Sequence, residues 1–346
     1  AREALAFQNF SVAVAEQTDP TAAARQNVAE ALRAIKSDPL APKAIVVLAL
    51  GEEDQGLQGD ILEAASKINR RDLNLQSQIL RKHLAAQDYD RSINTLDQML
   101  RVHPEYSPEF FPVLSEALDQ PETIPLFAEI LDGSAAWHER FLNYTVRQRV
   151  VLPSLAALRP MITSATVDFD KRVIAGLTGQ GDTERAAAIY RLVSGNEEPA
   201  ALNRPLGWAS EYPPFEWQFV DEAGFRAQPS RDGEELELFV RPGKGGLIAG
   251  RLLQAPDGPF AIRIEHDIKP AHQREDASLV LTCTNGTAPV LTQTLEQPTG
   301  TFQVQALPQE CDYMVLAINA RAWTGRSALR GSIKQISVVP GASTGN

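Results

Sequence analysis

Two pairs of carboxylates in the C-terminal third of the chain have the residue types that glycoside hydrolysis needs. Glu235 and Glu237 are two residues apart, and so are Glu265 and Asp267. Each pair would lie on one face of a strand. Cleavage of a glycosidic bond uses two carboxyl groups about 5–10 Å apart, which this spacing approaches. Any solvated strand face carries charges in the same way. A carbohydrate-active enzyme is therefore the alternative hypothesis, and a protein without catalytic residues is the leading one.

Other reactive motifs are absent from the sequence. It has no Gly-x-Ser-x-Gly nucleophile motif and no phosphate-binding loop that ends in Gly-Lys-Ser/Thr. His266 and His272 stand on either side of Asp267, but this spacing matches no closed metal site. We therefore expect no catalytic residue, no metal and no cofactor.

Aromatic side chains near arginines point instead to sugar binding. Trp323 lies between Arg321 and Arg326 in a polar segment that also contains Gly325. An exposed indole ring stacks well on the apolar face of a sugar, and arginines bind acidic sugar groups through bidentate hydrogen bonds. The competing interpretation is that Trp323 caps the end of a β-sandwich and binds no ligand. The predicted carbohydrate-binding residues are Trp323, Arg321, Arg326 and Tyr212.

Tyr212 belongs to a segment, residues 204–220, that separates two different patterns. The segment holds three prolines and five aromatic residues, so neither a helix nor a central strand is expected to run through it. Apolar residues recur with helical period before it and alternate with period two after it. A chain of 346 residues also exceeds one typical core. We predict a helical domain over residues 1–203, a packed hinge over residues 204–220 that includes Trp208, and a β domain over residues 221–346.

The helical part is predicted to be an α-solenoid of helix pairs. Asp38-Pro39, Arg71-Asp72 and His103-Pro104 recur about every 33 residues, each between two helical segments. A period of this length with two helices per unit is typical of tetratricopeptide repeats. The expected helices are residues 1–17, 21–37, 42–50, 59–68, 73–85, 89–102, 108–118, 124–131, 172–177 and 183–192, and helical spacing also relates Trp137, Phe141 and Tyr144.

One unit, residues 73–104, resembles a degenerate tetratricopeptide repeat, although the usual Trp, Gly and Tyr of the first helix are missing. Stacked helix pairs curve into a concave face that commonly binds a protein partner. A rigid spacer is the alternative. The residues that carry this resemblance are Ile79, Leu80, Ser92, Leu96, Met99 and Pro104.

The C-terminal part is predicted to be a β-sandwich of jelly-roll type. Short runs that alternate apolar and polar residues are separated by turn sequences such as Asn285-Gly286, with no helical segment between them. The expected strands are residues 234–241, 246–254, 260–268, 278–284, 290–297, 301–307, 312–320 and 328–338.

Composition restricts the partners and the compartment. The net charge is −11 and no cluster of Lys and Arg occurs, so the electrostatic signature of a nucleic-acid or anionic-lipid partner is missing.

The two cysteines, Cys283 and Cys311, lie at the end of one expected strand and the start of another. We predict a disulfide between them, which would place the protein outside the cytoplasm. Two reduced thiols on strands are the alternative.

The order of these parts resembles a family of proteobacterial envelope proteins with a degenerate tetratricopeptide-like repeat and a C-terminal β-sandwich. The residues that carry the resemblance are Arg70-Arg71-Asp72-Leu73, Pro214-Phe215-Glu216-Trp217, Cys283 and Cys311. The resemblance implies a periplasmic or envelope location, an N-terminal membrane anchor outside this chain, and an association with exopolysaccharide production. It supplies no catalytic residues. The leading hypothesis is a scaffold that holds a protein partner on its helices and polysaccharide on its sandwich; a purely structural adaptor is a further alternative.

Overall fold

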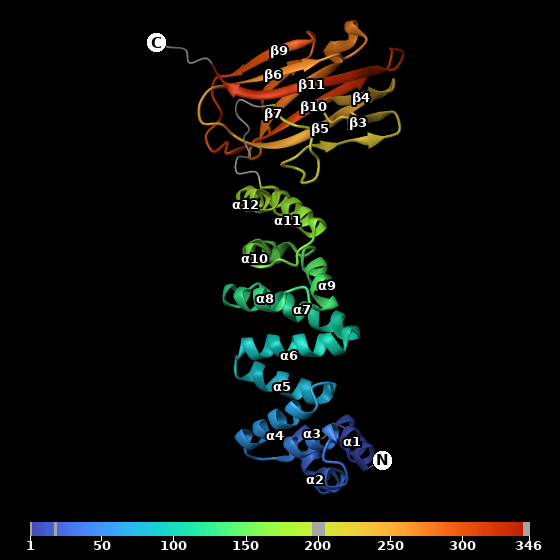
Figure 1. Ribbon diagram of the computed structural model, residues 1–346, viewed down its shortest axis with the longest axis vertical. Coiled ribbons are helices and arrows are strands. Elements are labelled where there is room, and N and C mark those ends of the chain that lie inside the picture. Colours follow the sequence, from blue (N-terminus) through green and yellow to red (C-terminus); the bar gives the residue numbers. More distant parts are fainter. Residues whose placement is uncertain (1, 17–18, 196–204, 342–346) are drawn as a thin grey trace. The chain divides into compact units, whose positions relative to one another are not determined.

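The computed structural model describes residues 2–16, 19–195 and 205–341 (Figure 1). A helical N-terminal region is followed by a region of two antiparallel sheets. The chain forms two compact units, the first made of Ala1–Thr145 with Met161–Ser164 and the second of Val146–Pro160 with Ala165–Asn346. The predicted domain boundary between residues 203 and 204 lies outside the described residues.

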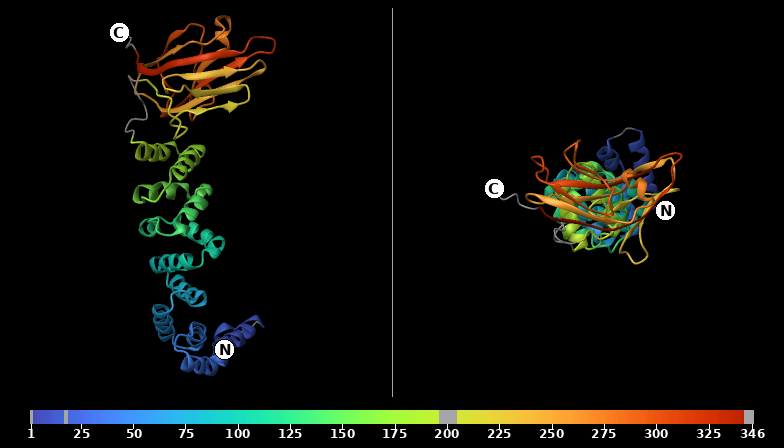
Figure 2. Two further views of the ribbon diagram at one scale, coloured as in Figure 1. Left: turned by 45° about the vertical axis from the view of Figure 1, so that its right-hand side comes forward. Right: turned by 90° about the horizontal axis from the view of Figure 1, so that it is seen from above.

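Helices fill the first unit, and consecutive helices from α1 to α6 pack against each other (Figure 2). The helices from α1 to α8 correspond to predicted ones, with α4 beginning four residues earlier than predicted, whereas no bounds were predicted for α9. The bounds are α1 (Arg2–Ala15), α2 (Pro20–Ser37), α3 (Pro42–Gly51), α4 (Gln55–Ile68), α5 (Leu73–Ala85), α6 (Tyr89–Val102), α7 (Ser107–Leu118), α8 (Ile124–Ile130) and α9 (Ala136–Thr145).

The recurring residue pairs of the sequence stand at helix ends. Asp72 is the N-cap of α5 and accepts a hydrogen bond from the Leu75 amide, which satisfies one of the unpaired donors of the first turn. Asp38 and His103 are the C-caps of α2 and α6. His103 Nε2 lies 2.8 Å from the carbonyl oxygen of Arg71, so two of the recurring residue pairs contact each other.

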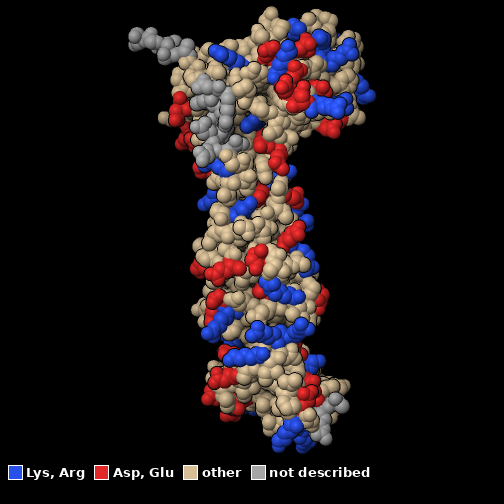
Figure 3. All heavy atoms as spheres, viewed as in Figure 1, with Lys and Arg blue, Asp and Glu red and all other residues tan. Residues whose placement is uncertain are grey.

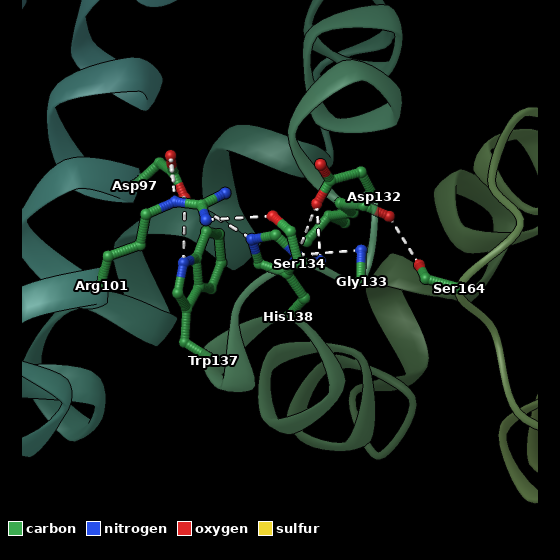
Figure 4. A network of polar contacts seen from close by, with 9 residues as sticks. Asp97, Arg101, Asp132, Gly133, Ser134, Trp137, His138 and Ser164 are labelled. Atoms are coloured by element: carbon green, nitrogen blue, oxygen red, sulfur yellow. Dashed lines mark hydrogen bonds and ion pairs between the residues drawn. The ribbon is translucent and has the colours of Figure 1, made fainter.

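A partly buried polar network joins α6 to α9 inside this unit (Figure 4). Asp97 on α6 accepts hydrogen bonds from Trp137 Nε1 at 3.0 Å and from Arg101 Nε at 2.8 Å. The amide of Gly133 donates to His138 Nδ1 at 3.2 Å, which leaves Nε2 to face Asp97 at 3.5 Å. His138 is buried, and its two ring nitrogens contact Gly133 and Asp97, so the side chain links α9 to α6.

The second unit contains three α-helices and eleven strands among its described residues, besides short 3-10 helices. The helices are α10 (Leu152–Leu158), α11 (Val167–Gly179) and α12 (Thr183–Ser194). The sequence analysis did not predict α10, although its buried residues Leu152, Leu155 and Ala156 have helical spacing. The strands are β1 (Gln218–Phe219), β2 (Asp221–Glu222), β3 (Phe225–Pro229), β4 (Leu236–Val240), β5 (Lys244–Gln254), β6 (Phe260–His266), β7 (Ala277–Cys283), β8 (Pro289–Thr294), β9 (Thr299–Val304), β10 (Tyr313–Ala322) and β11 (Leu329–Pro340).

The strands form two sheets around one core. The five-stranded sheet has the order β1-β5-β10-β7-β8, the six-stranded sheet has the order β2-β3-β4-β11-β6-β9, and every pairing between these strands is antiparallel. Strands β4 to β11 correspond to the eight predicted ones. The sequence did not predict β1 to β3, since β1 and β2 have only two residues each and β3 ends in a proline.

The aromatic segment before β1 is part of this core. Trp217 is fully buried, its ring lies 5.1 Å from that of Trp208, and its Nε1 donates to the Gly207 carbonyl. Phe215 stacks on Tyr190 of α12 with 5.1 Å between ring centroids. These aromatic residues therefore pack between α12 and the sheets.

A disulfide joins Cys283 at the end of β7 to Cys311 just before β10, with 5.4 Å between the two Cα atoms. Both residues belong to the core between the sheets. Within the described ranges, no helix has the length and apolar character that crossing a membrane requires.

Candidate functional site

The turn between β10 and β11 presents the exposed tryptophan that the sequence singled out. Strand β10 ends at Ala322, which is buried, and Trp323 begins the turn that Gly325 completes with a φ of 84°. The side chain of Trp323 no longer alternates into the core and is 50% exposed.

Asp276 holds this ring in place. Trp323 Nε1 donates to Asp276 Oδ1 at 2.9 Å, and Arg326 donates to Asp276 Oδ2 at 3.3 Å. The guanidinium carbon of Arg321 lies 4.8 Å from the centroid of the indole ring, in a cation–π arrangement. Three of the four predicted carbohydrate-binding residues therefore lie together.

Sequence reasoning did not find Asp276. It ends the short helix Ala271–Asp276, 47 residues before Trp323. The two meet because β7 and β10 pair with Ala277 opposite Ala320, which brings the start of β7 to the end of β10. No local pattern in the sequence reports this pairing.

Tyr212 does not belong to this cluster. It is 7% exposed and its ring lies 6.3 Å from that of Tyr190, so it packs the aromatic segment. Burial raises the pKa of its hydroxyl group. A sugar ring has no access to its face, and we leave Tyr212 out of the candidate site.

The charges around Trp323 are balanced. Arg326 pairs with Asp276 and lies 4.0 Å from Glu275, so its guanidinium is engaged by carboxylates of the protein itself. Arg321 is held over the ring. A half-open indole with its N–H already bonded offers an apolar face and little net charge. This arrangement suits a neutral sugar better than an acidic one.

In the pair of Glu235 and Glu237, Glu237 accepts a hydrogen bond from Gln228 Nε2 at 3.4 Å. The pair of Glu265 and Asp267 is engaged in ordinary surface contacts with lysines. Glu265 lies 3.4 Å from Lys334 and Asp267 lies 3.0 Å from Lys269. The hydrogen bond from Lys269 lowers the pKa of the Asp267 carboxyl group, whereas a general acid in glycoside hydrolysis needs a raised pKa. Asp267 is therefore poorly suited to that role.

The helical region also has a hollow of about 280 Å³ between α4, α5 and α6. Its lining includes Lys67, Arg70, Gln76 and Asn94. Of the residues that carried the tetratricopeptide resemblance, only Ile79 is in this lining. The buried ones are Ile79, Leu80, Ser92, Leu96 and Met99.

Comparison with known proteins finds remote likeness to solved structures. No protein-family model matches the chain. No curated protein matches it either. Among solved structures, one of accessory secretory protein 1, 2 and 3 in Streptococcus pneumoniae aligns with 10% identity and a TM-score of 0.27, over 40% of this chain and 96% of that chain. One of TmCBM61 in complex with β-1,4-galactotriose aligns with 9% identity and a TM-score of 0.24, over 35% of this chain and 86% of that chain. Alignments at these TM-scores do not establish a shared fold.

Proposed function

We propose that the protein is a non-enzymatic scaffold of the cell envelope that binds polysaccharide on its β region and a protein partner on its helices. The observation that carries the proposal is the half-exposed Trp323 ring, oriented by Asp276 and covered on one side by Arg321. Solvent-exposed aromatic rings in a fixed orientation stack on ligands with little loss of conformational entropy.

The finer description of the fold belongs to this proposal. We assign the β region to the jelly-roll type, and the strand orders support this: β4-β11-β6-β9 and β5-β10-β7-β8 are the two four-stranded sheets of an eight-stranded jelly roll, to which β1, β2 and β3 add edge strands. We assign the helices to a solenoid, which the packing of consecutive helices supports.

The location in the envelope is supported by the disulfide, because disulfides persist mainly in oxidising compartments. The role in exopolysaccharide biosynthesis or export is supported by the resemblance described above. The hollow between α4, α5 and α6 is the proposed surface for the protein partner.

Substitution of Trp323 tests the proposal. Trp323→Ala should weaken binding of a neutral oligosaccharide, identified on a glycan array, by at least about tenfold, which corresponds to about 1.4 kcal/mol. The melting temperature should change little, since half of the ring is exposed already. Trp323→Phe, which keeps an aromatic face, should retain part of the affinity.

If Trp323→Ala leaves glycan binding unchanged and costs about 3–5 kcal/mol of stability, the ring is a cap of the β region and the proposed site is wrong. Turnover of the bound glycan would instead favour an enzyme.

A further inference from the structure

The outer face of the six-stranded sheet carries a second set of side chains suited to ligand binding. Burial alternates along its strands, so that Leu238 and Val240 point into the core whereas Phe239 between them points outward. Figure 3 shows basic and acidic side chains gathered over this part of the β region.

Two hollows lie on this face and share strand β11. One, of about 400 Å³, is lined by side chains of β3, β4 and β11, among them Arg226, Phe239 and Arg330. The other, of about 410 Å³, is lined by side chains of β11, β6 and β9, among them Arg263 and Thr301. From β3 to β9 the sheet spans four inter-strand steps, or about 19 Å. The face is therefore long enough for a linear chain of sugars.

The pairing register places an aromatic ring between two arginines. Arg226 on β3 is directly opposite Phe239 on β4, and Phe239 is directly opposite Arg330 on β11. Directly opposed residues of an antiparallel pair project on the same side of the sheet. A guanidinium group thus stands on each side of the Phe239 ring.

The arginines share the two hollows with carboxylates but form no ion pair with them: Glu235, Glu237 and Asp267 line the first hollow and Glu265 lines the second. Across the described part of the chain, no carboxylate lies within ion-pair distance of Arg226, Arg330 or Arg263. The lysines of the same region, Lys269 and Lys334, do pair with carboxylates. Because Lys269 and Lys334 already pair with Asp267 and Glu265, the three guanidinium groups stand against the carboxylates of Glu235 and Glu237 alone. The face therefore has a small local excess of positive charge, in a chain of net charge −11, that can attract anions.

We propose that this face binds an acidic polysaccharide of the uronate class. The Phe239 ring would stack on the apolar face of one sugar, and Arg226 and Arg330 would bind carboxylates on either side of it through bidentate hydrogen bonds. The polar side chains of the second hollow, such as Thr301 and Gln335, would hydrogen-bond hydroxyl groups further along the chain. The inference rests on the proposed polysaccharide binding by the β region but places it on other residues and names a different ligand class from the neutral sugar of Trp323.

The test measures binding of the whole protein to oligogalacturonate by isothermal titration. The double variant Arg226→Gln/Arg330→Gln should bind it at least about tenfold more weakly, which corresponds to about 1.4 kcal/mol. Arg231→Gln is the matched control, because Arg231 is exposed in the turn between β3 and β4 and lines neither hollow. It should bind as the unmodified protein does, and thermal melting should show that both variants are folded.

Two further variants separate the inference from the proposed Trp323 site and from general charge attraction. Trp323→Ala should leave oligogalacturonate binding unchanged. Phe239→Ala should weaken binding of oligogalacturonate but not of polyglutamate, which offers carboxylates without sugar rings. The inference is overturned if the double variant binds oligogalacturonate normally, if the unmodified protein binds only neutral glycans, or if polyglutamate binds as well as oligogalacturonate. If the double variant loses oligogalacturonate binding while Trp323→Ala changes binding of no glycan, the site at Phe239 is supported and the proposed site at Trp323 is rejected.

Discussion

Asp97 is a single carboxylate that binds side chains from two helices. Its side chain is largely buried, which by itself raises its pKa, but the hydrogen bonds from His138, Arg101 and Trp137 outweigh burial and lower the pKa of Asp97 below its ordinary value. The ionised form is thus the one that the folded helical region stabilises.

Replacement of this carboxylate tests its contribution. Asp97→Asn should destabilise the helical region by about 1.5–3 kcal/mol at neutral pH, because it removes charge-assisted hydrogen bonds in a partly buried site. A group with a lowered pKa in the folded state contributes stability above the ordinary pKa, about 3.9, and loses it as the pH falls through the folded value. The difference in urea-unfolding free energy between the two proteins should therefore shrink below about pH 4.

The control for this prediction is an exposed carboxylate. Asp168 pairs with Arg172 one turn away on α11, and both side chains are well exposed. Asp168→Asn should cost no more than about 0.5 kcal/mol. An equal effect of both substitutions would contradict a special role for Asp97.

At the scale of elements, His103 connects the ends of two helix pairs. Its Nε2 faces the carbonyl oxygen of Arg71, before α5, and its Nδ1 lies 3.2 Å from Glu105. The hydrogen bond to the Arg71 carbonyl and the interaction with Glu105 raise the pKa of the His103 ring. The protonated ring is therefore the form that joins these segments.

A group with a raised pKa in the folded state contributes stability below its ordinary pKa, about 6.5, and loses it as the pH rises through the folded value. The melting temperature of His103→Gln should thus fall below that of the unmodified protein at about pH 5.5, and the difference should narrow above about pH 8. Both melting temperatures are measured from the helical signal in far-ultraviolet circular dichroism. His272→Gln, at an exposed position in the β region, is the control. A difference that does not change with pH would contradict the role of protonated His103.

At the scale of the whole molecule, the last helices and the sheets share one compact unit. The hydroxyl group of Tyr313 on β10 donates to Glu184 of α12 at 2.8 Å, and the Phe215 ring stacks on Tyr190. Burial, together with the hydrogen bond to Glu184, raises the pKa of Tyr313 to about 12. The predicted division into residues 1–203, 204–220 and 221–346 stays a prediction, and these contacts motivate a different division of the chain.

Two fragments test that division. Residues 205–346 lack α12, so Phe215 and Tyr313 lose their cover, whereas residues 146–346 retain it. We expect the shorter fragment to melt at lower temperature and to bind a hydrophobic dye. Its Tyr313 pKa should return from about 12 toward about 10, as measured by ultraviolet titration. Equal stability and equal titration of the two fragments would favour separate cores for the helices and the sheets.

The sequence by itself determined the type and approximate bounds of most elements. Helical period predicted the helices from α1 to α8 together with α11 and α12, and alternation predicted β4 to β11, because burial of one face imposes a repeat on a segment. The disulfide was predicted from the places of Cys283 and Cys311 next to strand ends. The exposure of Trp323 was predicted from its place in a polar segment after a strand. Strands of two residues, such as β1, escaped because they are too short to show alternation. The sequence also did not predict α10.

Only the tertiary structure decided which of these residues meet. Asp276 reaches Trp323 through the pairing of β7 with β10. Arg226 and Arg330 flank Phe239 through the register of β3, β4 and β11. Strand register depends on the packing of whole sheets and on turn geometry rather than on the residues of one strand. Tyr212 was wrongly placed in the site for the same reason, because its burial depends on packing against Tyr190 of α12, which its own segment does not report.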